Sequence, residues 1–426
     1  MGCIGSEIAH FLSLILLLCI YIYPLWCIRC NMKTQVTMSF LRERLPFSVS
    51  DNSVATNSDG SLIFLSGGCD AVNGNEYVDA GDYPGYYCSS VTSALVQFDP
   101  MEEKFTQLTS APRARYRHAS VMYNDRYLIL IGGRTLEDSL ITEVDVYDSL
   151  EQKWLQAGML PDVPSDMGSF ISDDGYVYVV GGYDAFYTAL SSMVMIKASD
   201  ILASVNQNNN ITTTDAPSML VPRGDVHAAI QTLDDGNMRA FVSGGFSHEN
   251  DFTAPLDDVE MFDLSSSEWY KIDGLIQGRG DKALQIHGKH LFAIGGEGKD
   301  SESNSIAHDD IETLEVGFTS VDDVKEEKWH RVGDIPSERF RFVSAVHPSK
   351  NVIYTFGGQR DLDESCNCYP TSDLVSSYEY TIEEDSDNNV DPVILAVVIS
   401  CFVAFMFFVI WTQRKQFLRV CKRSTK

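Results

Sequence analysis

Short hydrophobic runs that end in a pair of glycines recur along most of the chain. Each run follows a small polar turn, so turn and run together predict a β-hairpin whose second strand is buried on both faces. Glycine at the end of such a strand lets the backbone bend sharply. The six pairs are Gly67-Gly68, Gly132-Gly133, Gly181-Gly182, Gly244-Gly245, Gly295-Gly296 and Gly357-Gly358. The pattern predicts an all-β chain built from repeats.

Two further features follow most of the glycine pairs. The first is another strand that ends at an aromatic residue, namely Phe105, Trp154, Trp269 or Trp329. The second is a turn that contains proline and arginine, as in SAPRARYRH or GDIPSERFRF. The repeat unit is therefore predicted to contain four strands.

A repeat of about fifty residues with Gly-Gly after its second strand and tryptophan on its fourth resembles the kelch family of β-propellers. The resemblance covers the chain from about Thr34 to Ile382 and implies six blades. It departs from the family pattern in three repeats, because Phe105 replaces the first tryptophan, the third repeat has a polar insert and no tryptophan, and the fifth has an acidic insert. Only one strand follows the last glycine pair, so Thr34 to Phe40 is predicted to supply the outer strand of the sixth blade.

An uncharged apolar run from Val393 to Trp411 is long enough to cross a bilayer, since about nineteen helical residues rise roughly 28 Å. Acids precede this run and six bases follow it, which predicts a C-terminal transmembrane helix with a cytoplasmic tail. The predicted organisation is a propeller at 31–385, an acidic stalk at 386–392, the transmembrane helix at 393–411 and a basic tail at 412–426.

Residues 1–30 are predicted to be a signal peptide or a signal anchor. Phe11 to Ile22 has the length and composition of a signal-peptide core, although no basic segment precedes it. The first residues, MGCIGS, also match the N-myristoylation pattern. One interpretation is a cleaved signal on a single-pass type I protein, and the other is an acylated cytosolic end on a protein with two spans. Both place the propeller in the lumen or outside the cell.

The charge of the chain limits its partners. A formal net charge of −28 excludes nucleic acid as a ligand, because a polyanion repels phosphates. The loops that follow the glycine pairs are acidic or aromatic, whereas the connections between blades carry arginines. In kelch domains these two sets of loops share the face where partners bind, so a ligand-binding face is predicted at Arg113, Arg115, Arg117, Arg223, Arg279, Arg339 and Arg341.

Such arginines could hold a carboxylate or sulfate by bidentate pairing. The alternative is that arginine at this turn belongs to the internal bonding of the repeat. Two of the turns spell Arg-Gly-Asp, at 223–225 and 279–281, and their common register in the repeat explains them better than adhesion does.

The luminal or external location also bears on the cysteines and on glycosylation. Cys69 and Cys88 are predicted to form a disulfide across the long first loop. For Cys366 and Cys368 a mutual bond has poor spacing, and cross-pairing with the first loop is the main alternative. Asn210 is the acceptor of one glycosylation sequon, on the polar insert of the third repeat.

No enzyme motif is found in the sequence, so no catalytic residue and no cofactor are predicted. His287 and His290 flank a Gly-Lys turn and are expected to be surface residues that point apart. Acids such as Asp361 and Asp363 suit Ca²⁺, but no dense ligand spacing supports a metal site.

The predicted function is recognition of a protein or glycan ligand by the loop face of a membrane-anchored propeller. The alternatives are a sugar-acting ectoenzyme of the oxidase or isomerase type and an adhesive surface protein. A cluster of histidine, tyrosine and carboxylates at the central mouth would favour the enzyme, and arginine with aromatics alone would favour binding.

Overall fold

The structure is a computed structural model that describes residues 33–72, 88–207, 209–250, 252, 254–302, 304–365 and 368–383. The predicted signal segment, the stalk, the apolar run at 393–411 and the basic tail lie outside these ranges. None of the helices among the described residues has the length and hydrophobicity needed to cross a membrane. Residues Val36–Thr381 form one compact unit, which contains the repeats.

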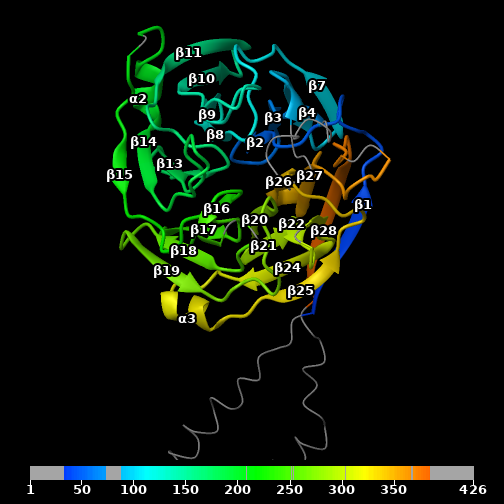
Figure 1. The fold of residues 1–426 in the computed structure, drawn as a ribbon. Helices are drawn as coiled ribbons and strands as arrows, with labels where there is room; N and C mark the ends of the chain where they lie inside the picture. Colours follow the sequence, from blue (N-terminus) through cyan, green and yellow to red (C-terminus); the bar gives the residue numbers. More distant parts are fainter. Residues whose placement is uncertain are drawn as a thin grey trace, which may run out of the picture. The chain divides into compact units, whose positions relative to one another are not determined.

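Six four-stranded antiparallel sheets are arranged around a central channel as the blades of a propeller (Figure 1). From the first to the sixth blade, and from the inner to the outer strand, the strands are β2 (Ser53–Thr56), β3 (Ile63–Ser66), β6 (Leu95–Asp99), β7 (Lys104–Gln107); β8 (Ala119–Tyr123), β9 (Tyr127–Ile131), β10 (Glu143–Asp148), β11 (Lys153–Met159); β12 (Gly168–Ile171), β13 (Tyr176–Val180), β14 (Met193–Lys197), β15 (Thr214–Ala216); β16 (Ala228–Thr232), β17 (Met238–Ser243), β18 (Val259–Asp263), β19 (Glu268–Ile272); β20 (Ala283–His287), β21 (His290–Ile294), β24 (Asp310–Glu315), β25 (His330–Asp334); and β26 (Val343–His347), β27 (Val352–Phe356), β28 (Val375–Glu383), β1 (Lys33–Phe40). The six-bladed fold is therefore confirmed.

The ring is closed by the N-terminal strand, as predicted. β1 is the outermost strand of the sixth blade and pairs with β28, while the inner three strands of that blade come from the C-terminal end of the repeats. A side-chain hydrogen bond between the hydroxyls of Ser39 and Ser377, at 2.9 Å, joins the two strands. Because the first and last repeats share one sheet, opening the ring requires breaking a strand pair.

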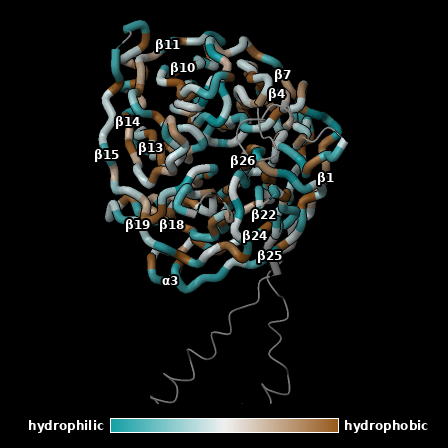
Figure 2. Tube along the Cα trace, viewed as in Figure 1, coloured by the Kyte–Doolittle hydropathy of each residue, from teal (hydrophilic) through white to brown (hydrophobic). Residues whose placement is uncertain are grey.

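The hydrophobic core is divided among the six interfaces between neighbouring blades. Side chains alternate along each strand, so β3 sends Ile63 and Leu65 toward the sixth blade and Phe64 toward the second. Figure 2 accordingly shows hydrophobic segments spread around the whole ring. Cross-strand aromatic pairs stand at one register in three blades: Phe98 with Phe105, Tyr147 with Trp154, and Phe262 with Trp269. Phe105 thus occupies the tryptophan position of the repeat.

The glycine pairs link each blade to the next. All twelve glycines have positive φ, and the second glycine of every pair donates its N–H to a backbone carbonyl of the connection that enters the next blade, at 2.8 to 3.4 Å. The last of these bonds, from Gly358 to Val49, joins the sixth blade to the first. A Cβ on Gly132 would stand 2.6 Å from the Pro164 carbonyl oxygen, so the close contact between this strand end and the next connection requires glycine.

The inserts lie between the third and fourth strands of their blades. The polar insert of the third repeat begins with helix α2 (Ala198–Ala203) and ends in β15, and the acidic insert of the fifth contains helix α3 (Val321–Glu326). Two small hairpins follow the first and fifth glycine pairs, and two 3-10 turns complete the fold: β4 (Cys69–Val72), β5 (Cys88–Val91), β22 (Glu297–Lys299), β23 (Ser305–Ala307), η1 (His248–Asn250) and η2 (Pro348–Lys350).

Candidate functional site at the mouth of the central channel

Six charged residues, one from each blade, surround one end of the central channel. Each lies two or three residues before the first residue of an inner strand. All six adopt the left-handed conformation, with φ between 49° and 57°: Asp51, Arg117, Asp166, Asp225, Asp281 and Arg341. We call this set the mouth ring. At this level a backbone N–H of each blade donates to the carbonyl of the mouth-ring residue in the preceding blade, at 2.8 to 3.4 Å. The donor is the mouth-ring residue itself in five blades and Val226 in the fourth. The Asp51 N–H donates to the Arg341 carbonyl and so closes the circle.

The mouth ring and the inner strands line a cavity of about 320 Å³. This volume falls in the range of small-ligand pockets, about 300–1,000 Å³. The residues that directly follow the glycine pairs form a second tier next to the mouth ring. Each makes a backbone bridge to the residue just before the mouth-ring residue of its own blade. They are Cys69, Arg134, Tyr183, Phe246, Glu297 and Gln359. The two sets of loops therefore share one face.

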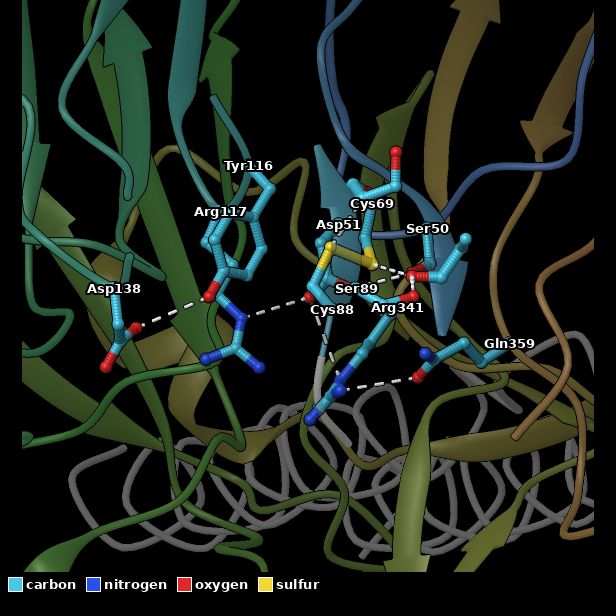
Figure 3. The surroundings of a disulfide bond; sticks show 12 residues. Ser50, Asp51, Cys69, Cys88, Ser89, Tyr116, Arg117, Asp138, Arg341 and Gln359 are labelled. Carbon is cyan, nitrogen blue, oxygen red and sulfur yellow. Dashed lines mark hydrogen bonds and ion pairs between the residues drawn. A yellow bond between two sulfur atoms is a disulfide. The ribbon is translucent and has the colours of Figure 1, made fainter. Parts of the chain in front are cut away.

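On one side of the cavity the carboxylate and guanidinium groups neutralise one another. Arg117 Nε lies 3.3 Å from both Asp51 and Asp166, and Arg341 Nε lies 3.0 Å from Asp281 and 3.8 Å from Asp51. Figure 3 shows Asp51 between Arg117 and Arg341, close to the Cys69–Cys88 disulfide. Burial opposes ionisation of Arg341, but Asp51 and Asp281 raise its pKa above the usual value. Arg117 behaves in the same way.

On the other side the carboxylates are less well compensated. Asp225 accepts a hydrogen bond of 2.7 Å from the Tyr183 hydroxyl and makes no ion pair within the described ranges. Burial, followed by the charges of Asp281 and Asp166, raises the pKa of Asp225 well above its usual value. Burial also raises the pKa of Asp281 to about 7, even though Arg341 favours its charged form. The channel therefore has an arginine-rich side and a carboxylate-rich side.

Four of the seven predicted arginines lie elsewhere. Arg115, Arg223, Arg279 and Arg339 are fully buried, and each donates to the carbonyl of the first glycine of its own blade, at 2.8 to 3.1 Å. We call them the clamp arginines. They also bond to polar side chains on the second and third strands of their own blades. This is the internal bonding that the sequence left open as an alternative, so they present no guanidinium to a ligand.

The remaining predicted arginines include one more internal partner. Arg113 is mostly buried and pairs with Asp145 at 2.5 Å and with Glu143 at 3.4 Å. Only Arg117 and Arg341 line the cavity. In both Arg-Gly-Asp turns the arginine is a clamp and the aspartate belongs to the mouth ring, so the tripeptide is not an exposed loop.

Sequence reasoning missed the four aspartates of the mouth ring. A signal was present for Asp225 and Asp281, because each follows a clamp arginine by two residues. The same offset recurs in four blades: Arg115 and Arg117, Arg223 and Asp225, Arg279 and Asp281, and Arg339 and Arg341. Aligning the repeats on the clamp arginine exposes a second position that is always charged. The first and third blades have no clamp arginine, so Asp51 and Asp166 give no such signal.

The expectation for His287 and His290 was wrong. They face each other as a cross-strand pair, both are buried, and both rings pack on Tyr380 at 5.4 to 5.8 Å. Directly opposed residues on two antiparallel strands share one face of the sheet, so the turn does not separate them. Burial lowers the pKa of His290 to about 4. The two histidines that line the cavity, His118 and His227, also have pKa values lowered by burial.

The predicted disulfide between Cys69 and Cys88 is present, with the two Cα atoms 5.6 Å apart. It ties β4 to β5 beside the mouth ring. Cys368 is disulfide-bonded as well, and since Cys69 and Cys88 bond to one another, the alternative of cross-pairing with the first loop is wrong. Asn210 is exposed, in the insert of the third blade. No group of described histidine, cysteine or acidic residues is arranged to hold a metal ion.

A closed ring of six four-stranded blades, with charged loops converging on its central mouth, defines the class of kelch-type propellers. A family model, the KLHDC2/KLHL20/DRC7 Kelch-repeats domain, matches residues 60–296, which is more than half of the chain. The chain therefore belongs to this kelch-repeat family.

Individual relatives are more distant. Kelch-like protein 23 of Homo sapiens is 24% identical over 229 residues, covering 54% of this chain and 35% of the relative. Kelch-like protein 25 of Xenopus tropicalis is 24% identical over 251 residues, covering 58% and 38%. The chain thus spans little more than a third of these relatives. Among solved structures, that of YjhT matches with a TM-score of 0.56 and 15% identity, covering 80% of this chain and 97% of the other, which supports the fold alone.

Proposed function

We propose that this protein is a membrane-anchored recognition module that binds a protein ligand at the mouth of its central channel. The observation that carries the proposal is the convergence of six charged side chains, one from each blade, on a single cavity of about 320 Å³. Its kelch relatives are an independent reason to favour binding over catalysis. Exposed apolar side chains on the second-tier loops, Leu136 and above all Phe186 at 89% exposure, offer further contact surface.

The binding proposal is tested with the full chain in detergent micelles, used as bait in a pull-down and on a glycan array. The matched variants are Asp225→Asn, in the mouth ring, and Asp234→Asn, in the exposed turn at the other end of the same inner strand. A protein that is retained by the wild type and by Asp234→Asn but lost with Asp225→Asn supports the proposal. Retention of glycans alone, or equal retention by both variants, contradicts it.

The membrane anchor and the external or luminal location belong to the same proposal. They are supported by the uncharged run at 393–411 with its flanking charges, and by the Cys69–Cys88 disulfide, because such bonds persist in oxidising compartments. Asn210 is exposed, so in a glycosylating host we expect glycosidase to increase the gel mobility of the wild type and not of Asn210→Gln. Identical mobility of the two proteins before digestion would remove this support.

A second candidate function is that of a sugar-acting enzyme. It is favoured by the make-up of the mouth, where aspartates and the histidines His118 and His227 line the cavity and Tyr183 bonds to Asp225, which is the kind of cluster expected of the enzyme. Asp281, whose pKa is about 7, suits proton transfer at neutral pH. Proton NMR of a panel of reducing sugars incubated with the full chain tests it. Turnover that is lost in Asp281→Asn would establish the enzyme, and the absence of any spectral change at equimolar protein would eliminate it.

A further inference from the structure

Three aspartates occupy consecutive positions of the mouth ring, in the third, fourth and fifth blades. The Val226 N–H donates to the Asp166 carbonyl at 3.4 Å, and the Asp281 N–H donates to the Asp225 carbonyl at 3.0 Å, so one run of backbone bonds holds the three blades together at this level. All three aspartates line the cavity. They face a common space without an arginine of the ring between them.

Among the described residues, few cations pair with this group. Arg117 reaches only Asp166 of the three, through one carboxylate oxygen, Oδ1. Arg341 reaches only Asp281 and is shared with Asp51 and Glu297. Asp166 is nine-tenths buried, yet its Oδ2 atom accepts no hydrogen bond from the described residues. A buried carboxylate oxygen without a donor is costly, which makes it a place where an incoming donor is stabilised.

A cluster of aromatic rings lies next to Asp225, whose carboxylate accepts a hydrogen bond from the Tyr183 hydroxyl. The Tyr183 ring lies against Gly224, where a Cβ would meet ring atoms, and the centroids of Phe252 and Tyr187 are 5.8 and 5.9 Å from that of Tyr183. Carboxylates next to aromatic faces suit an organic cation, because the ring quadrupole attracts positive charge and the apolar faces cover the stem of a long side chain.

We propose that the carboxylate side of the cavity binds an arginine or lysine side chain of the protein ligand, between Asp166, Asp225 and Asp281. The inference rests on the proposed protein-binding function and specifies the residue that anchors the ligand. The incoming cation donates to Asp166 Oδ2 and gives Asp225 the ion-pair partner that no described residue provides. The net charge of −28 attracts a basic partner from a distance and increases its association rate.

The experiment measures the affinity of short synthetic peptides for the full chain in detergent micelles by fluorescence polarisation. Each labelled peptide has one variable residue in a glycine–serine–tyrosine background, and this residue is arginine, lysine or citrulline. Citrulline has almost the shape of arginine but no charge. We expect the arginine and lysine peptides to bind at least tenfold more tightly than the citrulline peptide, and Asp225→Asn to remove most of that difference.

Two controls separate a local site from general attraction and from unfolding. Asp234→Asn makes the same substitution in the same blade at an exposed position, and we expect less than a twofold change. The thermal midpoint of Asp225→Asn reports whether the variant folds, and Asp166→Asn is the second variant if it does not. Equal binding of arginine and citrulline peptides overturns the inference, as does equal weakening by Asp225→Asn and Asp234→Asn. If a protein ligand found by pull-down still requires the mouth in that case, the proposed function stands without the basic anchor.

Discussion

The clamp arginines and the arginines of the mouth ring are two residues apart in sequence but have different partners. Arg339, a clamp, is fully buried and donates to backbone carbonyls and to the hydroxyls of Thr355 and Ser376. Arg341, in the ring, lines the cavity and pairs with carboxylates from neighbouring blades. The clamp holds one blade together, whereas the ring residue joins different blades around the channel.

This difference explains why the ring position can vary while remaining charged. A clamp arginine must reach a glycine carbonyl within its own blade, a task for which a planar guanidinium with several donors is suited. The ring position imposes left-handed backbone geometry and a place on the wall of the cavity, and it carries arginine in two blades and aspartate in four. Selection for a ligand can therefore act on the ring without weakening the individual blades.

The largest effect is expected from loss of a clamp. Arg279→Met removes the partner of the buried carboxylates of Asp310 and Glu312. An uncompensated buried charge costs about 3–5 kcal/mol, so we expect the free energy of unfolding to fall by that amount in urea titrations followed by tryptophan fluorescence. Arg331→Met is the control, because Arg331 makes exposed ion pairs and should leave the midpoint unchanged. Similar midpoints for both variants would show that the clamps do not stabilise the blades.

Much of the fold could be predicted from the sequence, because the glycine pairs and aromatic positions report local geometry that every blade repeats. The closing strand was also predictable, since a sheet with three C-terminal strands needs a fourth. The site was less accessible. Seven arginines share one type of turn, and only the two-residue offset separates Arg115 from Arg117. The aspartates gave no signal as single residues, because their convergence depends on bringing six distant turns to one axis.

A smaller effect is expected from loss of a ring arginine. Arg341→Met removes the cation that Asp51, Asp281 and Glu297 share. Because Arg341 lines the cavity, its carboxylate partners are less strictly enclosed than those of a clamp. Asp51 keeps Arg117 and Glu297 keeps Lys299, so the main cost is the lost ion pair of Asp281, about 1–3 kcal/mol. Protonation of the carboxylates relieves the repulsion, so the loss should be smaller at pH 5 than at pH 8. A destabilisation that does not change between these pH values would place Arg341 with the clamps instead.

The third effect concerns the pH dependence of stability. The folded-state pKa of Asp281 is raised to about 7 by burial and by Glu297, Asp51 and Asp166, against the effect of Arg341. The unfolded value is about 4, so between pH 4 and pH 7 the folded protein binds more protons than the unfolded chain, and stability falls as pH rises.

Asp281→Asn should remove a part of this slope, at most about 1.4 kcal/mol per pH unit, in unfolding curves measured at pH 4 to 7. Lys282→Met is the matched control from the adjacent position, whose side chain donates to the Ser243 carbonyl and does not line the cavity. Burial lowers the pKa of Lys282 to about 7, from an unfolded value near 10.5, so this lysine makes stability rise with pH only above about pH 7. Its replacement should leave the slope between pH 4 and 7 unchanged. If both variants change the slope between pH 4 and pH 7, the slope does not come from Asp281 alone, and the prediction is contradicted.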